Sequence, residues 1–346
     1  MANKLRKKLI VPIGKVVLSV LFLGIVVVLI IIYWPQNNIH KITKVKIEPG
    51  SSLTRITNQL HKEKIISNKK MFDFAVRILG KEKEIPIGTF NLIKAKSNYD
   101  IINQLIFGTP EVKKVTILEG WNINQIASQL SNKLGLDSTR VVQLAYDPLF
   151  LKSEGVSALS LEGYLYPDTY FFFIGDEPES ILSQLVKKHK QFWVRSHLIQ
   201  AKKLNLSKNE IITLASIIEG EAIHDSERPK ISAVYHNRLN IGMKLQADPT
   251  IQYIIRDGPR RLLNKDLRID SPYNTYLNKG LPPGPINSPS NQSLLAALYP
   301  ENNDFLFFVA TGDGYHTFTT NEKDHNKAKR KLQKLRRSLK RNKKNK

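Results

Sequence analysis

A continuous apolar stretch near the N-terminus constrains this chain more than any other feature. Residues 16–34 read VVLSVLFLGIVVVLIIIYW, nineteen residues without a charged side chain. A helix needs about 20 apolar residues to cross a hydrocarbon core of about 30 Å. A helix that is apolar on every side also has no face to turn toward water. The stretch therefore predicts a transmembrane helix rather than the buried core helix of a soluble domain.

The flanks of this stretch predict its orientation. Residues 1–15 carry five Lys and Arg side chains and no acid, whereas no cation follows directly after Trp34. By the positive-inside rule we expect a cytoplasmic N-terminus, with everything from about residue 36 outside the membrane. The apolar run is longer than the roughly 7–15 residues of a cleaved signal peptide, and Tyr33-Trp34 is typical of an interfacial aromatic belt. The sequence thus predicts a single-pass protein of the cytoplasmic (inner) membrane with an extracytoplasmic body.

The net charge of +23 at pH 7 raises the question of a nucleic-acid partner. Most of this charge lies at the two ends. Residues 1–15 contribute five positive charges and residues 323–346 a net twelve, which leaves +6 for the residues between them. No zinc-finger, basic-zipper or RNA-recognition pattern accompanies the charge, so we expect no nucleic-acid binding. The tail at 323–346 is expected to be a solvated basic helix or an electrostatic contact to an anionic polymer or lipid.

Composition excludes several kinds of chemistry. The chain of 346 residues contains no Cys, which excludes disulfides, thiolate metal sites, iron–sulfur clusters and cysteine nucleophiles. Neither a Walker loop nor a dinucleotide fingerprint is present. We therefore expect no cofactor.

Two segments seventy residues apart repeat one pattern. Residues 45–60 and 115–130 agree at seven positions, and each reads as a short strand, a Gly turn and an amphipathic helix. A chance match of two ordinary strand-turn-helix units is the alternative interpretation. With a strand-like stretch at 85–92 between the two copies, residues 40–145 are expected to form one α+β region.

The chain changes character after residue 145, where Pro, Tyr and Phe become frequent. The aromatic cluster at 162–174 is expected to be core and strand edge, or else a wall on which sugar rings stack. Periodicity then predicts a helical segment at 178–203. Two strands at 305–310 and 316–320 are expected to form a closing hairpin-like pair. We expect a second mixed α+β domain over 146–322, ahead of the basic tail.

A buried helix with an acidic end is the best candidate for catalysis. Ser207 and Glu210 form a capping box, and residues 211–218 are almost all apolar. The last turn then carries Glu219 and Glu221. The negative end of the helix dipole and an apolar surrounding both raise a carboxyl pKa. A carboxyl that keeps its proton near neutral pH can act as a general acid.

Three other interpretations of this acidic segment are open. The carboxylates could form a solvated helix end, or an ion pair with Arg228. They could also bind a metal, because five potential ligands lie close in sequence: Glu219, Glu221, His224, Asp225 and Glu227. No His-Glu-x-x-His spacing is present, so we expect no metal. Periodicity does not separate the two glutamates, since they flank the apolar stripe about equally.

The stretch that follows is polar and interrupted by Pro and Gly, over about residues 235–286. It is typical of turn-rich loops whose amide, hydroxyl and aromatic side chains orient a polyhydroxylated ligand. Most single Asn or Tyr residues in such loops are local caps. Beyond it, His316 is expected either to line the cleft or to pack beneath it.

Six ordered motifs together resemble the endolytic murein transglycosylase family. They lie at 214–221 (LASIIEGE), 227–228 (ER), 237–250, 271–276 (SPYNTY), 280–286 (GLPPGPI) and 316–318 (HTF). The resemblance extends over residues 16–326 and implies an inner-membrane anchor, a LysM-like β-α module over 40–145 and a mixed α+β catalytic domain over 146–322. It implies non-hydrolytic cleavage of the β-1,4 bond between N-acetylmuramic acid and N-acetylglucosamine, which leaves 1,6-anhydro ends and terminates nascent glycan strands.

The resemblance also implies residue roles and partners. The catalytic acid of the family is the second glutamate of the motif at 214–221, which is Glu221 here, and the partners are peptidoglycan strands and glycan polymerases (penicillin-binding proteins). We expect Glu219 to tune or position Glu221. We expect six further residues to line the cleft: Asn237, Gln246, Asp248, Tyr273, Asn274 and Thr275.

One carboxyl suffices for this reaction. Hydrolytic glycosidases use two carboxylates, but a 6-hydroxyl that attacks its own anomeric carbon needs only one group that first donates and then accepts a proton. The leading alternative is a non-catalytic, membrane-anchored glycan-binding scaffold of the wall-synthesis machinery. A metal hydrolase is the third hypothesis.

Overall fold

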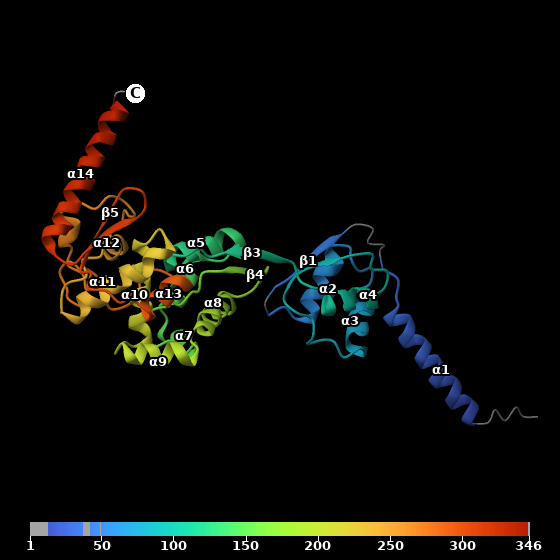
Figure 1. Cartoon of the computed structure of the whole chain (residues 1–346). Coiled ribbons are helices and arrows are strands. Elements are labelled where there is room, and N and C mark those ends of the chain that lie inside the picture. The colour runs from blue at the N-terminus through green and yellow to red at the C-terminus, as the bar shows by residue number, and fades with distance from the viewer. Residues whose placement is uncertain (1–12, 37–41, 49, 345–346) are drawn as a thin grey trace, which may run out of the picture. The chain divides into compact units, whose positions relative to one another are not determined.

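The computed structural model describes residues 13–36, 42–48 and 50–344 (Figure 1). The chain divides into two compact units, residues 1–113 with 171–176 and residues 114–170 with 177–346. The described strands form three two-stranded sheets among many helices. This mixture confirms the α+β class with one apolar helix at the N-terminus. Of the basic segment expected at 1–15, only the last three residues are described.

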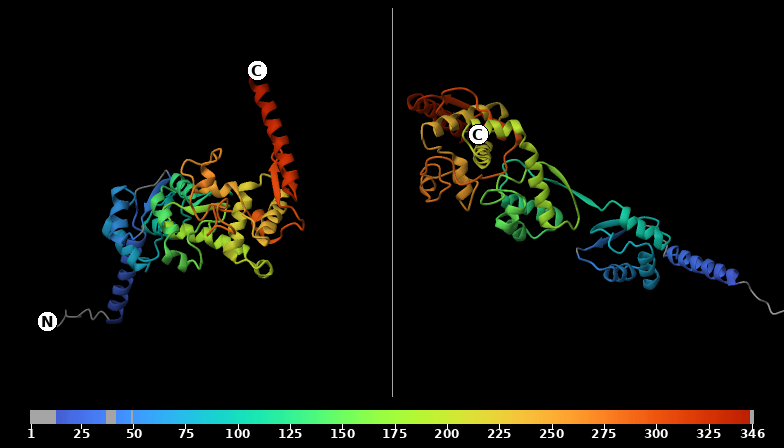
Figure 2. Two further views of the ribbon diagram at one scale, coloured as in Figure 1. Left: turned by 90° about the vertical axis from the view of Figure 1, so that its left-hand side faces the viewer. Right: turned by 90° about the horizontal axis from the view of Figure 1, so that it is seen from below.

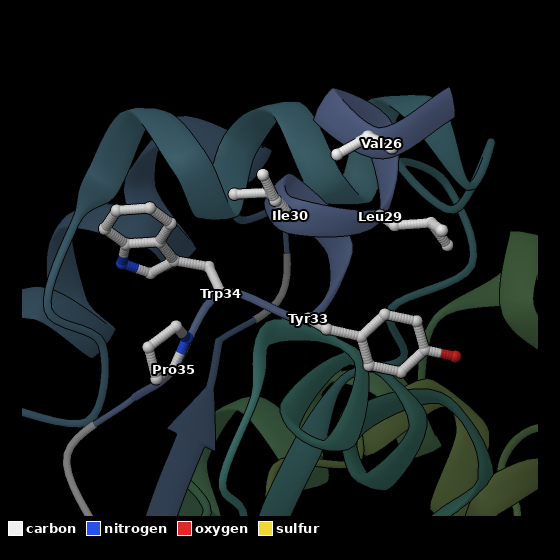
Figure 3. Close-up of a pocket in the computed structure, with 6 residues that line it drawn as sticks. All are labelled: Val26, Leu29, Ile30, Tyr33, Trp34 and Pro35. Carbon is white, nitrogen blue, oxygen red and sulfur yellow. The ribbon is translucent and has the colours of Figure 1, made fainter. Parts of the chain in front are cut away.

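The apolar stretch forms the first helix, α1 (Ile13–Ile32). The helix is long enough to cross a membrane, and its mean hydropathy of 3.1 over Gly14–Ile32 makes it apolar enough. The end of the helix is tied to the first unit, because Asn98 Nδ2 donates to the carbonyl oxygen of Ile31 at 2.8 Å and the Asn98 backbone N–H donates to that of Trp34 at 3.3 Å. These bonds satisfy carbonyls that a helix end leaves open. Figure 3 shows Tyr33 and Trp34 leaving the helix end in different directions.

Between residues 43 and 107 the first unit contains two strands and three helices: β1 (Thr43–Ile47), α2 (Leu53–Lys62), α3 (Lys69–Ile78), β2 (Gly88–Leu92) and α4 (Asn98–Phe107). β1 and β2 pair in antiparallel fashion, with Val45 opposite Phe90. Both side chains are fully buried in a core that also takes in the apolar faces of α2, α3 and α4. The strand expected at 85–92 begins only at Gly88.

The two copies of the sequence repeat have the same local structure. The second copy consists of β3 (Val112–Thr116) and α5 (Ile123–Leu134), and the first of β1 and α2. Gly50 and Gly120 lie between strand and helix with φ values of 70° and 73°, in a left-handed conformation that favours glycine. The strand-turn-helix expectation is confirmed for both copies. α2 belongs to the first unit and α5 to the second.

The repeated glutamine explains why the pattern includes a polar residue. Gln59 Nε2 donates to the carbonyl oxygen of Lys46 at 2.9 Å, and Gln129 Nε2 donates to that of Thr116 at 3.3 Å. These partners are also seventy residues apart. The same side chain therefore fastens the helix to its strand in each copy.

β3 pairs with β4 (Thr169–Phe173), a strand inside the aromatic cluster. The remaining helices and strands of the second unit are α6 (Ser138–Ala145), α7 (Pro148–Ser153), α8 (Pro178–Phe192), α9 (Arg195–Lys203), α10 (Lys208–Glu221), α11 (Arg228–Asn240), α12 (Asp248–Ile254), α13 (Asn291–Leu298), β5 (Phe307–Ala310), β6 (His316–Thr319) and α14 (Glu322–Lys344). Short 3-10 turns lie at Asp225–Glu227 and Asp266–Arg268.

Several expectations for this part of the chain can be compared with these bounds. The closing hairpin is confirmed, since β5 and β6 pair in antiparallel fashion. The helical segment at 178–203 is two helices rather than one, because Trp193 and Val194 leave the helical conformation. The basic C-terminal segment is largely helical: α14 contacts the hairpin, and its far end projects away from the second unit (Figure 1 and Figure 2).

α10 is the central helix of the second unit. Its N-terminus has the expected capping box, in which the Ser207 side chain accepts from the Glu210 backbone N–H and the Glu210 carboxylate accepts from that of Ser207. All eight residues from Ile211 to Ile218 are buried, and the helix contacts α9, α11, α12 and α13. The helix is therefore enclosed by four neighbouring helices, which fix its position in the second unit.

The expectation of loops over 235–286 was wrong for residues 235–240, which belong to α11, and for residues 248–254, which form α12. The polar side chains of α11 are hydrogen-bonded to distant backbone: Asn237 Nδ2 donates to the carbonyl of Asn303 at 2.8 Å, and Arg238 Nε donates to that of Leu306 at 2.7 Å. A helix whose polar residues are buried in this way has no apolar stripe. Periodicity could not reveal it.

We predict that Gly163→Ala destabilises the second unit more than Gly155→Ala does. Both glycines have positive φ, 78° and 60°, but a Cβ on Gly163 would lie 2.5 Å from Pro285 Cβ, whereas nothing lies within 4 Å of one on Gly155. Backbone strain alone costs about 1–2 kcal/mol, and overpacking adds about 1–3 kcal/mol. Thermal unfolding of the two variants measures the difference, and equal losses would contradict the packing described here.

Candidate active site

A cleft of about 1030 Å³ lies in the second unit. The end of α10, the start of α12 and the polar face of α5 form its walls. Glu221, Asp248, Trp121, Gln125 and Tyr253 are among the lining residues. A concave site of this size that contains a few polar groups is suited to an extended ligand.

Glu221 is the last residue of α10 and lies in this cleft. The Tyr235 hydroxyl donates to Glu221 Oε1 at 3.0 Å, and the backbone N–H of Asp248 also donates to the carboxylate. These two donors come from α11 and from the start of α12. They hold the carboxyl group in one orientation while leaving it accessible from the cleft.

The surroundings raise the pKa of Glu221 to about 7. Burial is the largest cause, because it removes water from the charged form, and the Asp248 carboxylate acts in the same direction. The hydrogen bond from Tyr235 and the charge of Arg238 oppose the shift only in part. Near neutral pH this carboxyl group is therefore about half protonated, which suits a group that must both give and take a proton.

Two tyrosines donate hydrogen bonds to the two carboxyl groups that line the cleft, those of Glu221 and Asp248. Burial raises the pKa of Tyr235 well above its usual value, so its hydroxyl stays protonated and can act as a donor. Tyr276 donates in the same way to Asp248 Oδ1. Both Glu221 and Asp248 thus have a neutral hydrogen-bond donor on the side facing the protein.

Glu219 points away from this cleft. Only 7% of its side chain is exposed, and its Oε2 lies 3.2 Å from Arg228 Nη1. The backbone N–H of Ser290 donates to the same oxygen at 2.8 Å. Glu219 therefore forms the ion pair with Arg228 that the sequence left open, and it fastens the last turn of α10 to the start of α13.

Gly220, between the two glutamates, allows α12 to approach α10. A Cβ at this position would lie 2.6 Å from Pro249 Cβ, a distance that side chains do not tolerate without movement. Because Pro249 directly follows Asp248, the close approach brings the Asp248 backbone and carboxylate beside Glu221. The close packing against Pro249 thus explains why a glycine lies between the two glutamates.

The other acidic residues of the segment have separate partners. Asp225 Oδ1 accepts from Arg228 Nε at 2.8 Å, and the Glu227 carboxylate pairs with His316 Nδ1 at 2.9 Å and accepts from the His316 backbone N–H. His316 also packs edge-on against Phe308. Within the described part of the chain, no three His, Asp or Glu side chains group together as a metal site requires.

Of the six residues expected to bind substrate, the structure brings Asp248 into the cleft beside Glu221. Tyr273 lies behind the wall, with its ring 5.1 Å from that of Tyr253. Gln246 is exposed and has a positive φ of 48°. Asp248 and Tyr253 thus line the cleft, with Tyr273 in contact with its wall.

The side chains of the other three expected residues form hydrogen bonds with backbone groups. Asn237 joins α11 to the chain before β5, as described above. Asn274 is fully buried, and its Nδ2 donates to the carbonyl of Ile269 at 2.8 Å. Thr275 Oγ1 accepts from the Ala247 backbone N–H at 3.0 Å. These side chains fix the loops around the cleft and do not line it.

Sequence reasoning missed one whole wall of the cleft, the polar face of α5. It also missed Glu162, which is buried and accepts from the Ile123 backbone N–H at the start of α5 at 3.2 Å. Tyr253 of α12 hydrogen-bonds to the same carboxyl group, and burial raises the pKa of Glu162 to about 8. A lone Glu within an aromatic stretch was the available signal, because such a residue must be paired if it is buried.

Known proteins are similar to this chain over most of its length. An endolytic murein transglycosylase of Bacillus subtilis (strain 168) is 36% identical over 305 residues, which are 83% of this chain and 84% of that protein. A protein of the same name from Streptococcus pneumoniae (strain R6) is 31% identical over 323 residues, 84% of this chain and 58% of that longer protein.

A solved structure is similar as well. The crystal structure of a yceG-like protein from Listeria monocytogenes is 33% identical, with a TM-score of 0.58, and the match covers 83% of this chain and 99% of that one. Residues 45–331 match the YceG-like family. This range includes the cleft, the repeat and the hairpin, and the chain therefore belongs to the YceG-like family.

Proposed function

We propose that this protein is an endolytic murein transglycosylase, a lyase that cleaves peptidoglycan strands, with Glu221 as its acid and base. The observation that carries the proposal is the position of Glu221, whose carboxyl group lines a cleft of about 1030 Å³ and has its pKa raised to about 7. Relatives named endolytic murein transglycosylase match more than four fifths of the chain.

The proposed reaction consumes no water. Protonated Glu221 gives its proton to the glycosidic oxygen, and the bond from this oxygen to the anomeric carbon of N-acetylmuramic acid breaks. The 6-hydroxyl oxygen of the same sugar bonds to that carbon, and its proton passes to the Glu221 carboxylate. The products are an N-acetylglucosamine end with a free 4-hydroxyl and a 1,6-anhydro end, and the enzyme regains its starting protonation state.

The surrounding residues have supporting roles in this proposal. Glu219 positions Glu221 by fastening the last turn of α10 to Arg228 and Ser290. Asp248 raises the proton affinity of Glu221, Gln246 contacts substrate at the rim, and Tyr273 supports the ring of Tyr253 in the cleft wall. Three further side chains hold the cleft loops from behind: Asn237, Asn274 and Thr275.

The membrane location is also part of the proposal. α1 spans the cytoplasmic membrane as a single-pass anchor with the basic N-terminus in the cytoplasm, so that the catalytic unit works on the outer side, where peptidoglycan is assembled. The repeated β-α modules act as LysM-like glycan contacts. An anchored enzyme of this kind can work beside glycan polymerases (penicillin-binding proteins) and terminate the strands that they elongate.

We predict that Glu221→Gln lowers the release of anhydro-ended fragments from purified peptidoglycan by about 10²–10⁴-fold, the usual contribution of a general acid. The amide keeps the size of the side chain and the hydrogen bond from Tyr235 but has no proton to give. Product masses distinguish a lyase from a hydrolase, whose products gain one water per cut.

Glu301→Gln is the matched control, because Glu301 is exposed and does not line the cleft; this variant should keep wild-type activity. Wild-type rates in Glu221→Gln would reassign the acid, first to Asp248, the other carboxyl group that lines the cleft. Intact strands after incubation with the wild-type protein would favour a glycan-binding scaffold instead.

We predict that Glu221→Gln stabilises the folded protein above pH 7 and leaves its stability nearly unchanged at pH 5. Folding raises the pKa of Glu221 from 4.5 to about 7, so the folded state binds the extra proton between these values. Wild-type stability therefore falls as the pH rises through this window, by up to about 3 kcal/mol, and the variant avoids this loss. Thermal unfolding of both proteins at pH 5 and pH 8 measures the effect, and a pH-independent difference would contradict the raised pKa.

A further inference from the structure

The two copies of the repeat differ on their exposed faces. In α2 the exposed positions include Arg55 and Lys62, whereas the positions seventy residues later, in α5, are Gln125 and Asn132. Just before the helices, Ser51 corresponds to Trp121. The buried half of the pattern is shared, so the fold of the module does not require these changes. The second copy thus has amides where the first has Arg55 and Lys62, and an aromatic ring where the first has Ser51.

A row of polar residues on this face lines the cleft; it corresponds to Thr54, Asn58 and Lys62 of the first copy, so that the second copy lacks the one charge of the row. Asn124, Ser128 and Asn132 are exposed, lie four residues apart on α5 and line the same cleft as Glu221. Residues four apart share one side of a helix. The three side chains therefore form a row of about 12 Å, at about 1.5 Å per residue, which is longer than one sugar ring.

The row is available for a ligand. Other polar residues of α5 serve the module itself: Asn122 caps the helix, and Gln129 binds the β3 backbone. Within the described part of the chain, the side chains of Asn124, Ser128 and Asn132 make no hydrogen bond to protein. Exposed amides and hydroxyls in a cleft can hydrogen-bond to a ligand at little desolvation cost.

We propose that this face of α5, made up of Trp121, Asn124, Ser128 and Asn132, binds the sugar residues of the glycan strand on one side of the cleaved bond. The inference rests on the proposed function. It places the strand along the helix, on the surface formed by these four residues, which we call the track. The face carries no charge, which favours hydroxyl and N-acetyl groups over the charged stem peptides. The Trp121 ring, at the end of the row nearest the start of α5, offers a surface on which a pyranose ring can stack.

A buried contact keeps the track at a fixed distance from the opposite wall. Glu162 accepts from the first backbone N–H of α5 and hydrogen-bonds to Tyr253 of α12, which lines the other side. The two walls therefore do not depend on the ligand for their spacing. A preorganised groove loses less ordering entropy when a flexible polymer binds.

The test measures binding of peptide-free glycan strands to the full-length protein in detergent, in a Glu221→Gln background that prevents turnover. Adding Asn124→Ala and Asn132→Ala should weaken binding about tenfold or more, because each lost amide removes about one hydrogen bond's contribution. Alanine is the best helix former, so the double variant should fold, and circular dichroism with thermal unfolding verifies this.

The matched control is Gln184→Ala with Gln191→Ala, which removes two exposed amides from α8 outside the cleft. It should bind strands as the parent does. Unchanged affinity in the α5 double variant, or an equal loss in the α8 control, would overturn the proposal.

The same variants in the otherwise wild-type chain separate this inference from the proposed function. The α5 double variant should raise KM for strands while kcat stays within about twofold, because it removes binding remote from the reacting bond. A loss confined to kcat would contradict the track. Absence of anhydro ends from the wild-type protein would instead remove the proposed reaction, even if the α5 residues still determined strand affinity.

Discussion

The burial of one apolar helix determines the chemistry of this protein. α10 has eight consecutive buried residues and ends in two glutamates, so its last turn must place one carboxyl group on each side of the helix. Glu219 is held by Arg228 and Ser290 on one side of the helix. Glu221 is largely buried where it lines the cleft, and it lies beside the Tyr235 hydroxyl and the Asp248 carboxylate. Burial and the second carboxylate raise its pKa to about 7. The same residue type thus performs two tasks because the two sides of one helix differ.

The repeated module shows how a surface can be changed without changing a fold. Both copies keep the left-handed glycine, the apolar stripe and the glutamine that binds its own strand. Their exposed faces evolve under no such packing constraint. In the second copy, α5 lines the same cleft as the end of α10, and the side chains that it contributes to the cleft are uncharged hydrogen-bonding groups. The module that the sequence presents as a separate region is thereby part of the candidate site.

The features that could be predicted from sequence are those encoded by neighbouring residues. The apolar N-terminal helix, the capping box at Ser207, the hairpin and the acidic end of α10 all follow from local patterns. The roles of Asn237, Asn274 and Thr275 could not be predicted in this way, because a buried amide that serves a distant carbonyl looks the same in sequence as one that serves a ligand. Likewise, periodicity places Glu219 and Glu221 equally far from the apolar stripe, and only tertiary neighbours separate them.

The central claim is that Glu221 holds its proton close to neutral pH, and its titration tests this directly. In protein labelled with ¹³C at glutamate side chains, the carboxyl signal that is absent from Glu221→Gln identifies this residue. The account predicts that this signal titrates with a midpoint near pH 7. A midpoint near 4.5, the value of an ordinary glutamate, would contradict it.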